Sequence, residues 1–179
     1  MKCVIRWIDG LFRIIGTIAG IVFIFAILLD FANVVGRYVF HRPIFWAEEI
    51  VVYGIIWCVM AGAALVVWRS NHLRVEILEM FVSKRLVTRL RFMLLLITAL
   101  VGLVMVTYGT QFVWFILSMD QRSTAANIPM GIPFAAIPVG FGLIVLAAVG
   151  RMARYLFDPA SEQALDSREG AADEMEASL

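Results

Sequence analysis

Charged residues are scarce in this sequence, at 16% of 179 residues, whereas an ordinary soluble domain has about 25%. Hydrophobic residues make up 62% of the chain, and the mean hydropathy is +0.90. The net charge is only +1, and no basic patch indicates a nucleic-acid surface. The composition therefore excludes an ordinary soluble domain and is typical of a protein whose solvent is lipid.

Cysteine and histidine are also rare, with two of each in the chain. Cys3 precedes the first apolar run and Cys58 lies inside the second, so a disulfide would draw polar backbone through lipid. His41 and His72 fall in separate polar connections, and no cluster has the spacing of metal ligands. No nucleophile and base pair is apparent. We therefore expect no disulfide, metal, cofactor or catalytic residue, and no enzyme activity.

Long apolar runs dominate what remains, at residues 14–36, 49–68, 92–118 and 132–150. Each reaches the length of about 20 residues that a membrane-spanning helix needs. The first run exceeds the apolar part of a signal peptide and lacks a small-residue cleavage site, so we expect it to stay in the mature chain. The sequence predicts an all-α integral membrane protein with four tilted transmembrane helices. These form one membrane domain over residues 1–157, followed by an acidic, disordered tail over 158–179.

The connection at residues 69–91 has a pattern of its own. Leu73, Ile77, Met80 and Phe81 share one face of a helix, with charged residues on the others. This pattern predicts a short amphipathic helix lying along the membrane interface between the second and third spanning helices. The alternative is a loop whose apolar residues pack on another subunit.

The basic residues predict the orientation, because cytoplasmic connections retain lysine and arginine. Of the 15 lysines and arginines, only Arg37, Arg42 and Arg122 fall on one side of the four predicted spans. The rest lie at the two termini and in the connection at 69–91. We therefore expect a multi-pass membrane protein with both termini in the cytoplasm.

A group of polar residues interrupts the apolar sequence around the first hairpin. Asp30, Asn33 and Arg37 fall at i, i+3 and i+7, so they share one face of the first helix. Glu48 and Glu49 open the second helix, where the helix dipole favours acids. Arg37 can reach these glutamates across a tight hairpin, and such pairing lowers the cost of charge near lipid. The group could clamp the hairpin, contact a partner protein or take part in an ion path.

Other residues of the second predicted helix have an ordinary structural interpretation beside a functional one. Trp46 and Trp57 suit anchoring at a membrane boundary. Gly62 and its alanine neighbours form a small-residue face that another helix could approach closely. Three basic residues follow the run: Arg69, His72 and Arg74. They satisfy the orientation rule, and His72 is either an interfacial histidine or a proton switch.

These residues together resemble the small membrane subunit of tripartite ATP-independent periplasmic (TRAP) transporters, the DctQ-type small permease. The similarity covers about residues 14–155 and is densest over 36–76. The matching residues are Asn33, Gly36, Arg37, Tyr38, Phe40, Pro43, Trp46, Ala47, Glu48, Glu49, Tyr53, Trp57, Gly62, Arg69, His72, Arg74, Val75 and Glu76. Glu76 stands where the family commonly has aspartate, which leaves the charge unchanged.

The resemblance implies a sodium-coupled secondary transporter that imports organic acids such as C4-dicarboxylates, 2-oxo acids or sugar acids. It implies two separate partner chains: a large DctM-type permease subunit that carries the substrate, and a periplasmic DctP-type binding protein that delivers it. The resemblance also implies a location in the bacterial inner membrane, where the small subunit would brace the large one among membrane lipids. The candidates for structural or partner contacts are then Asp30, Asn33, Arg37, Trp46, Glu48, Glu49, Tyr53, Trp57, Gly62, Arg69, His72, Arg74 and Glu76.

The residues themselves favour a supporting role. Alternating-access carriers generally need paired repeats and interrupted helices at the membrane midplane, and the four runs show neither. We therefore expect no substrate site in this chain. Two alternatives remain: a self-associating small carrier or channel with Asp30 as coupling carboxylate, and a membrane anchor of a redox complex, which would need histidines within the bilayer.

Overall fold

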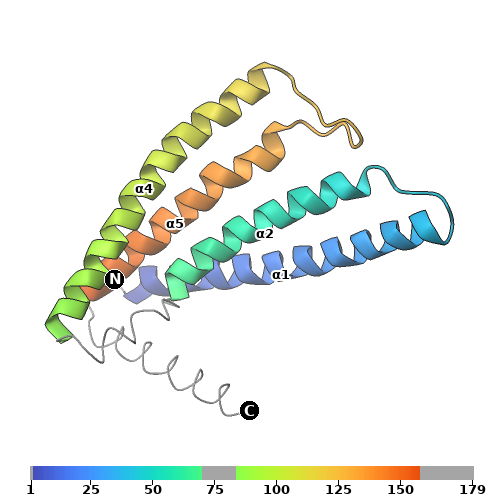
Figure 1. The fold of residues 1–179 in the computed structure, drawn as a ribbon. Coiled ribbons are helices and arrows are strands. Elements are labelled where there is room, and N and C mark those ends of the chain that lie inside the picture. Colours follow the sequence, from blue (N-terminus) through green and yellow to red (C-terminus); the bar gives the residue numbers. More distant parts are fainter. Residues whose placement is uncertain (1, 70–83, 158–179) are drawn as a thin grey trace, which may run out of the picture.

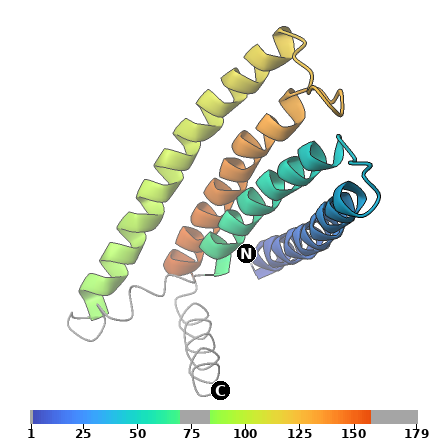
Figure 2. The same ribbon diagram turned by 45° about the vertical axis from the view of Figure 1, so that its right-hand side comes forward.

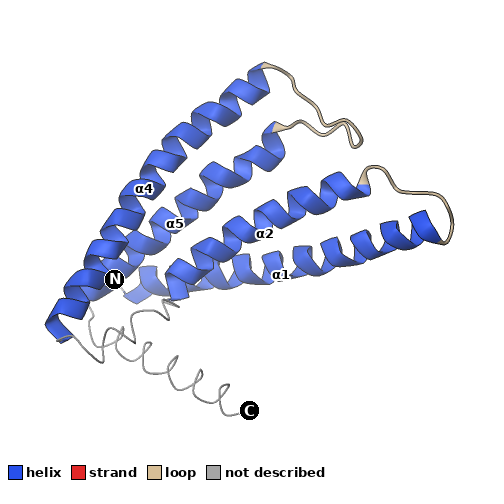
Figure 3. Ribbon diagram, viewed as in Figure 1, coloured by secondary structure: helices blue, strands red, loops and turns tan. Residues whose placement is uncertain are grey.

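A computed structural model describes residues 2–69 and 84–157 of the chain. The described residues form the helices α1 (Lys2–Tyr38), α2 (Ala47–Arg69), α4 (Lys84–Ser118) and α5 (Gly131–Phe157), shown in Figures 1 and 3. All four are long and apolar enough to cross a membrane. This part of the chain has no β-strand, only an isolated bridge between Arg122 and Pro129. The prediction of an all-α, multi-pass membrane protein is therefore confirmed.

The helices extend beyond the apolar runs that predict them. The predicted starts at residues 14 and 92 fall inside α1 and α4. With 37 residues, α1 is about 55 Å long at a rise of 1.5 Å per residue, against a hydrocarbon core of about 30 Å. An apolar run marks only the part of a helix that suits lipid, because long charged side chains let the helix continue into the interface.

Two predictions concern residues that the structure does not describe. The predicted interfacial helix falls mostly on residues 70–83, outside the described residues, whereas the connection from Lys84 onward already belongs to α4. The predicted acidic tail at 158–179 also lies outside the described residues.

The four helices lie side by side in the order α1, α2, α5, α4, as Figures 1 and 2 show. Loops 39–46 and 119–130 lie at one end of this layer, called here the loop end. The opposite end, called here the terminus end, holds the start of α1 and the ends of α2 and α5. Because α1 and α4 are the outer helices of the layer, large apolar side chains such as Phe31 and Leu100 remain exposed on them.

Two glycines let neighbouring helices approach closely. A Cβ atom on Gly140 of α5 would lie 2.5 Å from Cε and 2.6 Å from Cβ of Met60 on α2. A Cβ atom on Gly102 of α4 would lie 2.6 Å from Cγ2 of Val145 on α5. Small residues at these crossings allow close backbone packing, which drives helix association in lipid, where the hydrophobic effect is absent.

The core of the fold lies toward the terminus end. Its buried residues are Phe12 of α1, Ala64 and Trp68 of α2, and Ile144 and Ala147 of α5. The rings of Phe12 and Trp68 stack with their centroids 5.0 Å apart, an arrangement that adds about 1 kcal/mol to the burial itself. Helices α1, α2 and α5 therefore form one packed unit at this end.

Candidate functional site

Most of the polar side-chain contacts between separate elements of the described chain gather in two clusters, one at each end of the layer. The loop-end cluster comprises Asn33, Arg37, Glu48, Glu49 and Ser123. The terminus-end cluster comprises Asp9, Trp68, Val67, Arg151 and Arg154. Each cluster ties together elements that are far apart in the sequence, so these contacts position the helices relative to one another.

In the loop-end cluster, Asn33 and Arg37 fix loop 39–46. The side chain of Asn33 is buried, and its Oδ1 atom accepts a hydrogen bond of 2.8 Å from the backbone N–H of Ile44. One turn further, Arg37 forms an ion pair with Glu48. Both charged side chains are about half exposed, so we expect this pair to contribute less than about 1 kcal/mol. The buried amide contact is the stronger constraint on the hairpin.

Glu49 binds a different loop from Glu48. Its Oε2 atom accepts hydrogen bonds from the Ser123 hydroxyl at 2.5 Å and from the Ala126 N–H at 2.8 Å. Its Oε1 atom accepts a third from the Ala125 N–H at 3.1 Å. Consecutive helical residues point about 100° apart, so the two glutamates serve separate loops. We expected Arg37 to reach both glutamates; in the structure it pairs with Glu48 alone.

The terminus-end cluster joins three helices around one carboxylate. Oδ1 of Asp9 on α1 accepts a hydrogen bond of 2.7 Å from Arg154 of α5 and one of 3.0 Å from the Trp68 indole N–H of α2. The Arg154 guanidinium also lies 4.2 Å from the centre of the Trp68 ring, close enough for a cation–π interaction. Arg154 is 5% exposed and Asp9 48%, so the carboxylate reaches solvent or headgroups while the guanidinium does not.

A second arginine of α5 donates a hydrogen bond to a backbone carbonyl at the end of α2. Arg151 is buried and donates a hydrogen bond of 3.2 Å to the backbone carbonyl of Val67. The last carbonyls of a helix lack partners within the helix, and basic side chains commonly bind them. Arg151 and Arg154 lie three residues apart, hence on one face of α5, and both hold α2 from that face.

The remaining predicted residues of the described chain lie apart from these clusters. Asp30 is exposed and makes no hydrogen bond or ion pair within residues 2–69 and 84–157. Trp46 and Arg69 are exposed as well. The Tyr53 hydroxyl lies 3.6 Å from the sulfur of Met130, in loop 119–130.

Gly62 of α2 faces open space, with no atom within 4 Å of a Cβ placed on it, so it serves no close helix contact within the described chain. The neighbouring Ala64 is the small residue that is buried in the core. The other predicted residues, His72, Arg74 and Glu76, lie outside the described residues.

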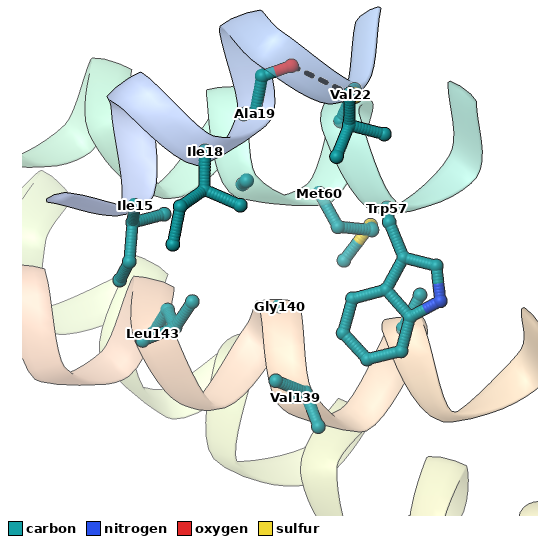
Figure 4. A pocket seen from close by; sticks show the side chains of 12 residues that line it. Ile15, Ile18, Ala19, Val22, Trp57, Met60, Val139, Gly140 and Leu143 are labelled. Atoms are coloured by element: carbon teal, nitrogen blue, oxygen red, sulfur yellow. Dashed lines mark hydrogen bonds between the residues drawn. The ribbon is translucent and has the colours of Figure 1, made fainter. Parts of the chain in front are cut away.

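An apolar groove of about 350 Å³ lies between α1 and α5 and is lined by α2 as well. Ile18 of α1, Trp57 of α2 and Leu143 of α5 line it (Figure 4). Cys58 also lines the groove and donates a hydrogen bond to the Ala19 carbonyl. The groove holds no charged side chain, and no metal-binding group of histidine, cysteine, aspartate or glutamate occurs in the described part of the chain. Its chemistry suits hydrocarbon and offers nothing to a carboxylate or a cation.

Sequence reasoning missed the terminus-end cluster and Ser123. One signal was present: Arg151 and Arg154 share a helix face, and Asp9 is the first acid in the chain. On the sequence alone, the two arginines indicate only positive charge at the cytoplasmic side. Nothing in the sequence distinguished Ser123, because its role depends on the turn that presents it to Glu49.

Four long apolar helices define this chain as a multi-pass membrane protein, and comparison with known proteins narrows the class. The family model described as "Tripartite ATP-independent periplasmic transporters, DctQ component" matches residues 26–158. The chain therefore belongs to the DctQ family of TRAP transporter small permease components. The match covers both glutamates and both α5 arginines, whereas Asp9 and Phe12 precede it.

A curated relative supports this assignment. The C4-dicarboxylate TRAP transporter small permease protein DctQ of Vibrio cholerae serotype O1 is 28% identical over 140 residues. The aligned part covers 65% of this chain and 60% of the relative, so it spans less than two thirds of that protein's length. Members of this family are components of transporters, which agrees with the expectation that the chain is not an enzyme.

Proposed function

We propose that this chain is the stationary small subunit of a sodium-coupled TRAP transporter that imports organic acids such as C4-dicarboxylates, 2-oxo acids or sugar acids. It holds a large DctM-type permease subunit in place in the bilayer while that subunit carries the substrate. A DctP-type binding protein in the periplasm delivers the substrate to the complex. Family membership supports the transporter class, and the arrangement of polar side chains supports the stationary role.

The observation that carries the proposal is the use of the polar side chains. Asp9, Arg154, Asn33 and Glu49 bind other parts of the same chain, and the groove between the helices is apolar. A substrate carboxylate in the membrane would need fixed positive charge or hydrogen-bond donors. The described helices are also continuous through their spans, whereas carriers generally bind ions at interrupted helices. A subunit that only holds a partner in place needs neither a substrate site nor interrupted helices.

The positions of the basic residues support an orientation with the terminus end in the cytoplasm. Arg13, Arg69, Arg151 and Arg154 lie toward that end of the described helices, and retained positive charge favours the cytoplasmic side. The loop end then faces the periplasm of a cell with an inner membrane. Loops 39–46 and 119–130 are accordingly available to the binding protein.

The exposed faces of the layer are the surfaces for the large subunit and for lipid. Ile21 and Leu28 of α1 and Leu103 of α4 are more than half exposed. Lipid tails can pack against such an apolar surface, and so can the complementary face of another membrane protein. A single layer of helices offers more surface to a partner than a closed bundle of the same length, which suits a brace.

Reconstitution tests the proposal. The chain alone, the large subunit alone, and both together are placed in proteoliposomes with the binding protein and a sodium gradient, and uptake of a labelled organic acid is measured. We expect uptake only when both membrane subunits are present. Uptake by the chain alone would show instead that it is an independent carrier, with Asp30 as the first residue to substitute. Full uptake by the large subunit alone would remove the need for a brace.

A further inference from the structure

Loop 119–130 is a small, internally hydrogen-bonded turn. The Ser123 N–H donates to the Ile128 carbonyl at 2.9 Å, and the Met130 N–H donates to the Gln121 carbonyl at 2.9 Å. The Ile128 N–H donates to the Ser123 hydroxyl oxygen at 3.2 Å. Asn127 takes a positive φ of 52°, a conformation that asparagine adopts more readily than most residues. The two sides of the turn therefore hold each other without help from the helices.

These internal bonds leave three donors pointing the same way. The Ser123 hydroxyl proton and the N–H groups of Ala125 and Ala126 all meet the carboxylate of Glu49. Ser123 is buried and Ala126 is half-buried, whereas Ala125 is exposed. Without Glu49, the donors of Ser123 and Ala126 would lose hydrogen bonds that water cannot fully replace. Successive backbone N–H groups that converge in this way form anion-binding concavities known as nests.

We propose that residues 123–126 form a carboxylate-binding nest, that Glu49 is its built-in ligand, and that this contact holds loop 119–130 against the start of α2. The loop extends from the tip of α4 toward the loop end of α2 before it returns to α5, as Figure 1 shows. Glu49 is thus a positioning residue: it fixes the α4–α5 hairpin against the start of α2 through loop 119–130. This role of Glu49 does not depend on what the transporter carries.

The geometry requires a glutamate. The nest supplies only donors, and they divide between both carboxylate oxygens. Glutamine has one oxygen and one NH₂ group, so at least one nest donor would face another donor. Aspartate is shorter by one carbon–carbon bond of about 1.5 Å, which places its oxygens out of hydrogen-bond range. Charge-assisted hydrogen bonds are also about twice as strong as neutral ones.

Hydrogen exchange in the full-length chain, in lipid nanodiscs, tests this proposal through the amides of residues 121–130. We expect exchange to be about tenfold faster at the half-buried Ala126, and faster by a smaller factor at the exposed Ala125, in Glu49→Ala and Glu49→Gln than in the wild type. Glu48→Ala is the matched control: it removes the adjacent acid and its pair with Arg37, and it should leave these amides unchanged. Wild-type exchange in Glu49→Gln would overturn the proposal.

Chemical rescue separates a carboxylate nest from a merely structural contact. Glu49→Ala removes the heavy atoms of an acetate ion, so acetate can occupy the vacated place. We expect sodium acetate to restore slow exchange at Ala125 and Ala126 in this variant, whereas equal concentrations of acetamide or sodium chloride should not. Equal rescue by acetamide, or none by acetate, would contradict the nest.

A second variant keeps the proposal testable if Glu49→Ala does not fold. Ser123→Ala removes one donor of three, so exchange at Ala125 and Ala126 should rise by a smaller factor. No rise in this variant would also contradict the proposal.

Discussion

Replacing Asp9 should destabilise the chain more than replacing Arg154, although Arg154 is the more deeply buried partner. The reason lies in what each substitution leaves behind. Asp9→Asn leaves a guanidinium that is 5% exposed without its counter-charge, whereas Arg154→Met leaves a carboxylate that is 48% exposed. A half-exposed carboxylate can be hydrated, but a buried guanidinium cannot.

The expected magnitudes follow from this difference. Breaking a buried ion pair by removing one partner costs about 3–5 kcal/mol. Because Asp9 is half exposed and asparagine keeps an acceptor for Trp68, we expect Asp9→Asn to lose about 2 kcal/mol. Nε of Arg154 has no hydrogen-bond partner in the described structure, so Arg154→Met also removes an unsatisfied donor. We expect it to lose about 1 kcal/mol or less.

The assay is a double-mutant cycle on the free energy of unfolding, measured by titrating the full-length chain with a denaturing detergent. The double variant Asp9→Asn/Arg154→Met should be about as stable as Arg154→Met alone, because the asparagine no longer faces a buried charge. Equal losses from the two single variants, with additive losses in the double variant, would refute the reasoning. Such a result would mean that the two side chains act independently.

Other contacts give further predictions, all measured on the full-length chain in lipid. Trp68→Phe should lower the free energy of unfolding by about 2–3 kcal/mol, because it removes the indole N–H donor and leaves part of the buried ring's volume empty. Gly140→Ala should lower it by about 1–3 kcal/mol, because its methyl group would overlap the facing methionine of α2; the control Gly62→Ala, which faces open space, should not lower it. Asn33→Ala should speed hydrogen exchange at the amide of Ile44 about tenfold, since that half-buried amide loses its acceptor. An unchanged rate there would mean that the loop is held by other contacts.

The helices could be predicted from the sequence because each depends on local composition. A run of about 20 apolar residues is enough to indicate a spanning helix, whatever the rest of the chain does. The ends of α1 and α4 could not be predicted in this way, since Lys2 and Lys84 lie in polar segments that continue a helix after it leaves the hydrocarbon.

The contacts between helices depend on information that a single sequence does not display. The pairing of Asp9 with Arg154 joins residues 145 positions apart and requires α1, α2 and α5 to meet in that order. Arg37 could be matched with Glu48 because one short hairpin separates them. Glu49 differs from Glu48 only by the direction of its side chain, and its partners depend on the turn at residues 123–126.

Distances within the small subunit during transport test the central claim, that this chain stays still while its neighbour moves. Spin labels at Ala32→Cys on α1 and Gln111→Cys on α4, with Cys3 and Cys58 replaced by serine, report the separation of the outermost helices by pulsed electron paramagnetic resonance. The measurement uses the complete transporter in nanodiscs, with and without sodium and substrate-loaded binding protein. We predict one unchanged distance distribution in all conditions. A separation that shifts with sodium and substrate would contradict the account, because the chain would then move with the transport cycle.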